Sequence, residues 1–152
     1  MRTKYEQDNF AVYKGKIYSA YTKEGLIILR SYDIKDVEEN GFEKLVPKSS
    51  CSEVKGLKNV SPYEVTEYYE QRFEAKYKGK NVGIMSGDDN QVDIQPNPED
   101  FTYEDLIKFG FEQVEKGVYE KNLPTSELTD IHAIKRSKLE NAKKRFDEIT
   151  EY

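Results

Sequence analysis

A twelve-residue segment of this chain occurs twice. The segment YEQDNFAVYKGK at residues 5–16 returns as YEQRFEAKYKGK at residues 69–80, with eight of the twelve positions identical. A second landmark, Gly-Phe-Glu, follows each copy and begins at Gly41 and at Gly110. A duplicated chain is expected to repeat one local fold, with its sites between the copies or on their loops. We therefore predict an internal duplication.

The length and composition indicate one soluble domain. The chain has 152 residues, and a copy of about sixty residues alone would bury too small a share of its surface to be stable. We therefore predict a single domain over residues 1–152, with internal repeats at 5–58 and 69–125 that share one core. Twelve Tyr and seven Phe supply large apolar surfaces that offset a hydrophobic content of only 36%.

The net charge limits the partners that the chain can bind. The 29 acidic and 24 basic residues give a net charge of −5, which disfavours nucleic acid because its binding depends on Lys and Arg. A basic protein partner suits this charge better. No apolar stretch reaches the length of a membrane span and no signal peptide is evident, so we expect no membrane partner and a cytoplasmic location. The single cysteine, Cys51, cannot form an internal disulfide, consistent with a reducing compartment.

Alternating side chains predict strands in both copies. Between Tyr69 and Tyr77 every second residue is charged, which is the period of a strand with one buried face. Turn residues at 22–25 and 86–90 separate each first strand from a second one, so each copy is predicted to contain a long β-hairpin. Gly15 is predicted to mark a bulge or bend within the first strand.

Capping residues predict a short helix after each hairpin. Asp33 is the expected N-cap of the first helix, with Asp36 at its third position, and Thr102 and Asp105 have the same spacing in the second copy. Each helix would end before the glycine of a Gly-Phe-Glu landmark. Residues 61–64 (SPYE) carry a further capping pattern, which predicts a short helix leading directly into the second copy.

The last part of the chain is predicted to form one long helix over residues 126–150. Its apolar residues stand at helical spacing, namely Leu128, Ile131, Leu139, Ala142, Phe146 and Ile149. We expect this helix to pack on the body of a monomer, with pairing between two copies as the alternative. The predicted fold class is α+β, with two related antiparallel β-hairpin plus short-helix units, an internal duplication, and a long C-terminal helix.

No catalytic or metal-binding pattern accompanies the repeat. His132 is the only histidine, and it is predicted on the last helix without a marked catalytic partner. One histidine and one cysteine leave too few ligands for zinc. The acidic turn that begins at Asp88 lacks the later glycine and glutamate of an EF-hand. We therefore predict no catalysis, no metal and no cofactor, and an enzyme is only the third hypothesis.

Acidic residues collect in and beside the two short helices and at one turn. Part of this pattern is explained by the favourable interaction of acidic groups with helix N-termini. We interpret the rest as a negative surface that attracts a basic partner, with an exposed tyrosine as an anchor. The predicted partner-binding residues are Asp36, Glu38, Glu39, Asp88, Asp89, Glu99, Asp100, Tyr103 and Glu104.

Three segments carry a family resemblance. They are residues 60–66 (VSPYEVT), residues 77–80 (YKGK), and residues 117–121 (GVYEK) leading to SEL at 126–128. The chain resembles small immunity proteins that Gram-positive bacteria encode beside secreted polymorphic toxins of the LXG and wall-associated types. The resemblance implies a cytosolic, non-catalytic protein that binds a toxin's C-terminal domain, often a nuclease, and blocks its active site or substrate groove. No binding residue is carried over from that family.

The resulting prediction is an antitoxin that neutralises a basic cognate toxin, with a nuclease as the expected toxin. The alternative is a general protein-interaction module or a phage-derived regulatory module. The identity of the neighbouring gene product separates these two hypotheses, because only the first requires a secreted toxin beside this protein.

Overall fold

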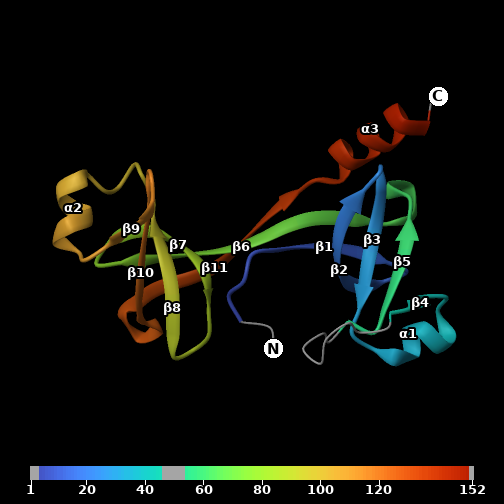
Figure 1. Ribbon diagram of the computed structural model, residues 1–152, viewed down its shortest axis with the longest axis horizontal. Coiled ribbons are helices and arrows are strands. Elements are labelled where there is room, and N and C mark those ends of the chain that lie inside the picture. Colours follow the sequence, from blue (N-terminus) through green and yellow to red (C-terminus); the bar gives the residue numbers. More distant parts are fainter. Residues whose placement is uncertain (1–3, 46–53, 151–152) are drawn as a thin grey trace. The chain divides into compact units, whose positions relative to one another are not determined.

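The computed structural model describes residues 4–45 and 54–150 (Figure 1). Cys51 lies outside these described residues. The chain divides into two compact units. Unit 1 comprises Asp8–Glu70 and the chain from Arg136 through the last helix, whereas unit 2 comprises Gln71–Lys135 together with residues 4–7.

Unit 1 is built on an antiparallel sheet with the strand order β4-β5-β3-β2-β1-β6. Helix α1 connects β3 to β4, and the 3-10 turn η1 connects β5 to β6. Strand β6 begins in this unit, and helix α3 belongs to it. The elements are β1 (Asp8–Tyr13), β2 (Lys16–Lys23), β3 (Leu26–Ser31), α1 (Ile34–Glu39), β4 (Glu43–Lys44), β5 (Gly56–Val60), η1 (Pro62–Glu64), β6 (Glu67–Tyr77) and α3 (Leu139–Thr150).

Unit 2 has the same order of elements and the same strand order as unit 1. Its strands follow the order β9-β10-β8-β7-β6, and β11 pairs with β6 as β6 pairs with β1 in unit 1. A short helix and a 3-10 turn occupy the matching places in the chain. The elements after β6 are β7 (Lys80–Gly87), β8 (Gln91–Pro96), α2 (Tyr103–Lys108), β9 (Glu112–Glu115), β10 (Val118–Pro124), η2 (Thr125–Glu127) and β11 (Leu128–Ser137).

The protein is therefore mostly antiparallel β-sheet with a few helices. The predicted hairpin of each copy is a three-stranded meander, because Gly15 lies in a tight turn and not in a bulge. Tyr13 pairs with Lys16 across Lys14 and Gly15, whose φ angles are 49° and 79°. Positive φ at both central residues is typical of a two-residue hairpin turn. Residues 78–79 form the same turn between β6 and β7.

The predicted caps are confirmed. The Asp33 side chain accepts a hydrogen bond from the backbone N–H two residues later, at the start of α1. Thr102 and Asp105 form a reciprocal capping box at α2, with bonds of 3.1 and 3.0 Å. Ser61 and Glu64 form a second capping box, but the element it begins is only the 3-10 turn η1 and not a full helix.

The long helix predicted over residues 126–150 is wrong in its first half. That part forms the 3-10 turn η2 and strand β11, and only α3 is helical. β-branched residues such as Ile131 and Ile134 favour a strand, and pairing with β6 satisfies the backbone. His132 therefore lies exposed on a strand and not on a helix.

Each unit has its own hydrophobic core, so the prediction of one shared core is wrong. Leu29 in β3 and Ile94 in β8 are both fully buried, but they belong to separate clusters. The physical reason is that each unit contains more strands than a single hairpin, and three or more strands with an apolar face can close a core. Tyr5, from the first repeat, packs in the core of unit 2, 5.2 Å from the ring of Phe73.

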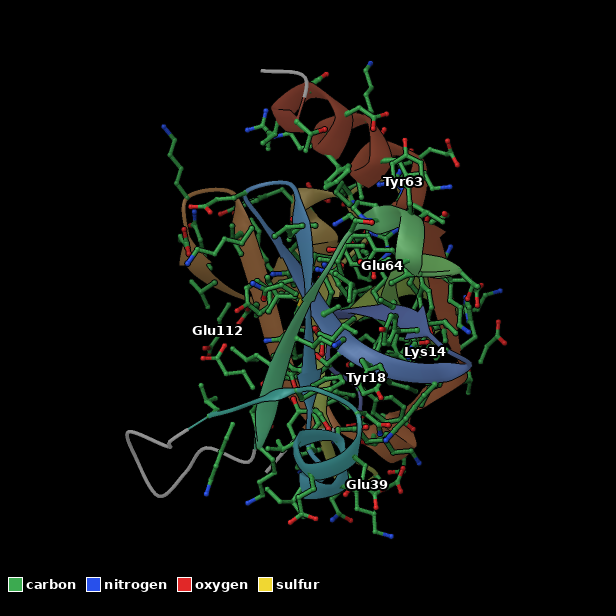
Figure 2. The ribbon with its side chains drawn as sticks, turned by 90° about the vertical axis from the view of Figure 1, so that its right-hand side faces the viewer. Lys14, Tyr18, Glu39, Tyr63, Glu64 and Glu112 are labelled. Carbon is green, nitrogen blue, oxygen red and sulfur yellow. The ribbon has the colours of Figure 1, made fainter. Side chains whose placement is uncertain are left out.

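Helix α3 packs against the other elements of unit 1. Ala142 is buried in the core of this unit, and Leu139 packs beside it. Figure 2 shows Tyr63 next to α3, where its hydroxyl donates to the Asp147 carboxylate at 2.8 Å. Within the described residues, no helix has the length and apolar character needed to cross a bilayer.

Candidate functional site

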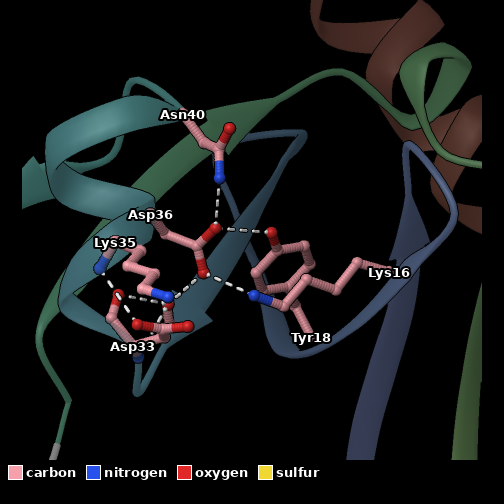
Figure 3. Close-up of polar contacts among 7 residues, drawn as sticks. Lys16, Tyr18, Asp33, Lys35, Asp36 and Asn40 are labelled. Carbon is pink, nitrogen blue, oxygen red and sulfur yellow. Dashed lines mark hydrogen bonds and ion pairs between the residues drawn. The ribbon is translucent and has the colours of Figure 1, made fainter.

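Asp36 is buried, so it does not belong to an acidic surface as the sequence had predicted. The residue is 0% exposed, and its carboxylate accepts hydrogen bonds from four groups (Figure 3). The donors are Lys16 Nζ at 3.0 Å, the Tyr18 hydroxyl at 3.0 Å, Asn40 Nδ2 at 2.8 Å and the Ser31 hydroxyl. Asp36 therefore anchors α1 to strands β2 and β3 and is not available to a partner.

The electrostatics of this cluster agree with a structural role. Burial alone would raise the pKa of Asp36, but hydrogen bonds from Ser31, Asn40, Lys16 and Tyr18 outweigh it and hold the pKa at about 2. Burial, together with the hydrogen bond to Asp36, raises the pKa of Tyr18. At neutral pH the carboxylate is thus charged and fully satisfied, which stabilises one arrangement of the helix.

Asp88 and Asp89 hold the turn between β7 and β8. The Asp88 carboxylate accepts from the backbone N–H groups of Asn90 and Gln91, at 2.8 and 3.1 Å, and these bonds lower its pKa. The Asp89 carboxylate pairs with Lys4 Nζ at 2.8 Å. This turn precedes β8, whereas α2 follows it, and six residues of strand span roughly 20 Å. The structure therefore does not bring these two residues to α2.

The acidic residues of α1 and α2 lie in different units. Glu38 and Glu39 are exposed on α1, and Figure 2 shows Glu39 on that helix. Glu99 and Asp100 lie just before α2, and Glu104 lies in its first turn. Glu99 and Glu104 are exposed, whereas Asp100 is half-buried and accepts a hydrogen bond from the backbone N–H of Asn81 at 2.8 Å.

Apolar side chains are exposed among the acidic residues of unit 2. Tyr103 is 65% exposed, as predicted for an anchor, and Ile107 is 61% exposed. These two residues are four positions apart, so they share one face of α2, while Leu106 points into the core. Ile107 was not predicted as a site residue, although its spacing of four positions from Tyr103 can be seen in the sequence. Val114 in β9 is a third exposed apolar residue, at 53%.

The negative charge is concentrated around α2. The register places Lys121 opposite Ile94 in unit 2 and Lys58 opposite Leu29 in unit 1, so residues 95–121 match residues 30–58. Residues 95–121 contain seven acidic and three basic residues, a net charge of −4. Residues 30–58 contain six of each, a net charge of zero. Most of the net charge of −5 therefore lies in one segment of unit 2.

A groove of about 410 Å³ opens beside α2. Its walls come from the end of β8, the segment leading to α2, α2 itself, and the turn and first residues of β10. None of the lining residues is charged, so the groove is suited to an apolar group. We call it the α2 groove, and its lining residues are Gln95, Pro96, Pro98, Phe101, Leu106, Gly117, Val118 and Tyr119.

At the matching position in unit 1, the strand and the helix approach closely. Gly56 in β5 corresponds to Tyr119 in β10, and Val37 in α1 corresponds to Leu106 in α2. A Cβ atom on Gly56 would lie only 2.6 Å from Val37 Cγ2, so the backbone of β5 packs directly on α1. In unit 2, a tyrosine replaces the glycine and forms one wall of the α2 groove.

The described residues contain no group of three or more His, Cys, Asp or Glu side chains that could hold a metal ion. His132 Nδ1 lies 2.8 Å from the backbone carbonyl of Asp130 in its own strand. The α2 groove with its acidic surroundings is therefore the site that we consider further. Its lining is uncharged and mostly apolar, and the exposed residues Glu99, Tyr103, Glu104 and Ile107 belong to the same segment of the chain.

The groove and its surroundings lie inside a region that matches a known family. Residues 5–140 match the family model described as "Uncharacterised conserved protein UCP033725". Neither the curated proteins nor the solved structures contain a significant match to this chain. The family match covers more than half of the chain and includes both units' sheets and short helices. The chain belongs to the family described as Uncharacterised conserved protein UCP033725.

Proposed function

We propose that this protein is a non-catalytic immunity protein that binds and neutralises a basic cognate toxin. The observation that supports this most is the net charge of −4 in residues 95–121, next to the exposed side chains of Tyr103 and Ile107. A nuclease is the expected toxin because it must hold phosphates with Lys and Arg. An acidic inhibitor can occupy the same basic substrate groove.

The arrangement of charge supports rapid and selective association. Negative charge concentrated on one segment attracts a basic partner to that segment more strongly than scattered charges would, and it orients the partner during the encounter. The matching segment of unit 1 has no net charge. We therefore assign the binding role to unit 2 and a supporting role to unit 1.

The exposed apolar side chains supply the centre of the proposed interface. Protein interfaces are energetically dominated by a few residues, often Tyr, at a desolvated centre surrounded by polar groups. Tyr103 and Ile107 occupy one face of α2, and Glu99 and Glu104 are close to them in the chain. This combination is suited to a partner with an apolar centre and a basic rim.

We also propose that the two units arose by internal duplication. The equal order of elements and strands supports this proposal, as do the eight identical positions among twelve. Matched ion pairs add to it, since Lys16 Nζ lies 3.0 Å from Asp36 and Lys80 Nζ lies 3.8 Å from Asp105. After duplication, one copy could keep a structural role while the other acquired a binding surface.

The test is a pull-down of the tagged full chain against the product of the adjacent gene, followed by calorimetry at two salt concentrations. A growth assay with both proteins expressed together measures protection. The double variant Glu99→Lys/Glu104→Lys should weaken binding by about tenfold or more, because two rim charges are reversed. The matched control, Glu38→Lys/Glu39→Lys on α1, should leave binding unchanged.

Two outcomes would remove the proposal. The first is that the wild-type chain neither binds the adjacent gene product nor protects cells. The second is that this product is harmless to unprotected cells. Binding to a harmless neighbour would instead assign the protein to general protein interaction. Equal losses in the two double variants would contradict the assignment of the site to unit 2 while keeping the immunity role.

A further inference from the structure

A second hollow adjoins the α2 groove within unit 2. It has a volume of about 300 Å³ and shares Gln95, Pro96 and Pro98 with the α2 groove. Its other walls come from Arg72 and Glu74 in β6, from β7 including Asn81, and from Asn97, which follows β8. We call it the polar hollow, because amide and charged side chains replace the apolar walls of the groove.

The segment between the two hollows can only accept hydrogen bonds through its backbone. Pro96 and Pro98 have no backbone N–H, and the N–H of Asn97 already donates to the carbonyl of Asn81 at 3.2 Å. A ligand that bonds to the backbone of this segment must therefore supply the donors. Backbone N–H groups of an extended peptide, or Lys and Arg side chains, meet this requirement.

Carboxylates lie next to the walls of both hollows. Glu120 follows Tyr119 in β10, and its Oε1 accepts a hydrogen bond from Gln95 Nε2 at 3.4 Å. Glu99 and Asp100 lie between two lining residues of the α2 groove. In the polar hollow, Glu74 is paired with Arg72 at 3.4 Å. A cationic side chain beside an apolar one would therefore find complementary charge at the edge of the groove.

We propose that the α2 groove and the polar hollow together bind one extended basic segment of a partner protein. An apolar side chain of that segment fills the α2 groove, and its backbone crosses residues 96–98 towards the polar hollow. A neighbouring Lys or Arg pairs with Glu99 or Glu120. This inference rests on the proposed binding function and specifies the chemistry of the segment that the site recognises.

The probe is a capped seven-residue peptide with one phenylalanine between two pairs of lysines and a glycine at each end. It is titrated into the isotope-labelled full chain and followed by amide chemical shifts in NMR spectra. We expect shifts to cluster at Phe101, Val118 and Tyr119. Replacing the phenylalanine by alanine, or all lysines by glutamates, should each weaken binding by about tenfold, because each removes one of the two recognised features.

A variant of the site provides the second part of the test. Val118→Arg places a positive charge and a longer side chain in the wall of the α2 groove, and it should weaken binding of the phenylalanine peptide by about tenfold. Ile17→Arg is the matched control, since Ile17 is an exposed strand residue of unit 1 at 58%. The peptide series on the wild-type chain needs no variant, so the test stands even where Val118→Arg fails to fold.

Several results would overturn the inference. Diffuse shifts, shifts away from the groove, or equal binding of the alanine peptide would exclude an apolar anchor in the α2 groove. Concentration-dependent shifts of the same residues without peptide would assign the groove to a second copy of this chain. If the Val118→Arg variant binds the toxin as tightly as the wild-type chain does, this inference is removed but the immunity role is kept. If the peptide binds but the toxin does not, the inference is kept and the immunity role is removed.

Discussion

The two units place an aspartate at the same position of their short helices and use it in different ways. In unit 1, Asp36 is fully buried and accepts four side-chain hydrogen bonds. In unit 2, Asp105 is half-exposed and accepts a bond from the backbone N–H of Thr102 at 3.0 Å. That bond lowers the pKa of Asp105. The same residue is thus a core anchor in one unit and a helix cap in the other.

The difference follows from the residues that surround each aspartate. By strand register and helix position, three donors of unit 1, Tyr18, Ser31 and Asn40, correspond to Val82, Pro96 and Phe109 in unit 2. None of these three replacements has a side chain that can donate a hydrogen bond. A buried Asp105 would be left without its partners, so it stays at the surface. In unit 2, the aspartate therefore caps α2 at the surface, and the α2 groove lies beside the same helix.

The largest expected effect comes from removing Asp36. Asp36→Ala deletes the acceptor of four donors, and breaking such a buried charged cluster costs about 3 kcal/mol of unfolding free energy. Asp105→Ala is the matched variant, and its loss should be smaller because its partners face solvent. Urea unfolding gives the total loss of unfolding free energy. Hydrogen exchange, compared between β2 and β3 of unit 1 and β7 and β8 of unit 2, shows which unit loses stability. Similar losses in both variants would contradict the different roles of the two aspartates.

Low pH should lower the folding stability through the same residue, Asp36. Folding lowers the pKa of Asp36 from 3.8 to about 2, so the unfolded chain binds its proton more tightly. The stabilisation is therefore complete above about pH 4 and is lost as the pH falls towards 2, a change of about 2 kcal/mol. Urea unfolding midpoints measured across this pH range give the slope of folding stability against pH. Asp36→Asn, which cannot titrate, should show a shallower slope, and an unchanged slope would assign the effect to other carboxylates.

A smaller loss of stability should come from adding a methyl group at Gly56. Gly56→Ala places a methyl group 2.6 Å from Val37 Cγ2, and this overpacking should cost about 1.5 kcal/mol. Gly83→Ala is the control in unit 2, because a Cβ there meets nothing within 4 Å, and it should change stability by less than about 0.5 kcal/mol. Unfolding midpoints measure both. A neutral Gly56→Ala would mean that α1 can move away from β5 without cost.

Local rules predicted the parts of the fold that depend on neighbouring residues. The caps at Asp33, Thr102 and Ser61 follow from side chains two or three positions away, and the structure confirms them. Strand β11 was predicted as a helix because Leu128 and Ile131 are three positions apart, a spacing that fits the period of a helix and not the strict alternation of a strand. Pairing with β6, which is distant in the chain, decides between them.

For the same reason, only part of the candidate site could be predicted from the sequence. Glu99, Tyr103 and Glu104 are close in the chain, so their grouping around one helix follows from the sequence. The burial of Asp36 could not be predicted, because its donors come from two other strands. Tyr119, which forms one wall of the groove, stands where unit 1 has Gly56, and this match becomes visible only when the strand register is known.

Unit 2 interrupts unit 1 along the chain. Unit 1 breaks off at Glu70 and resumes only at Arg136, so α3 is its final element. During synthesis, unit 2 therefore leaves the ribosome before α3 does, and Ala142 is among the last residues to reach the core of unit 1. A nascent chain whose residues up to Lys138 have left the ribosome would carry a finished unit 2 and a unit 1 that still lacks α3, with apolar core residues open to chaperones.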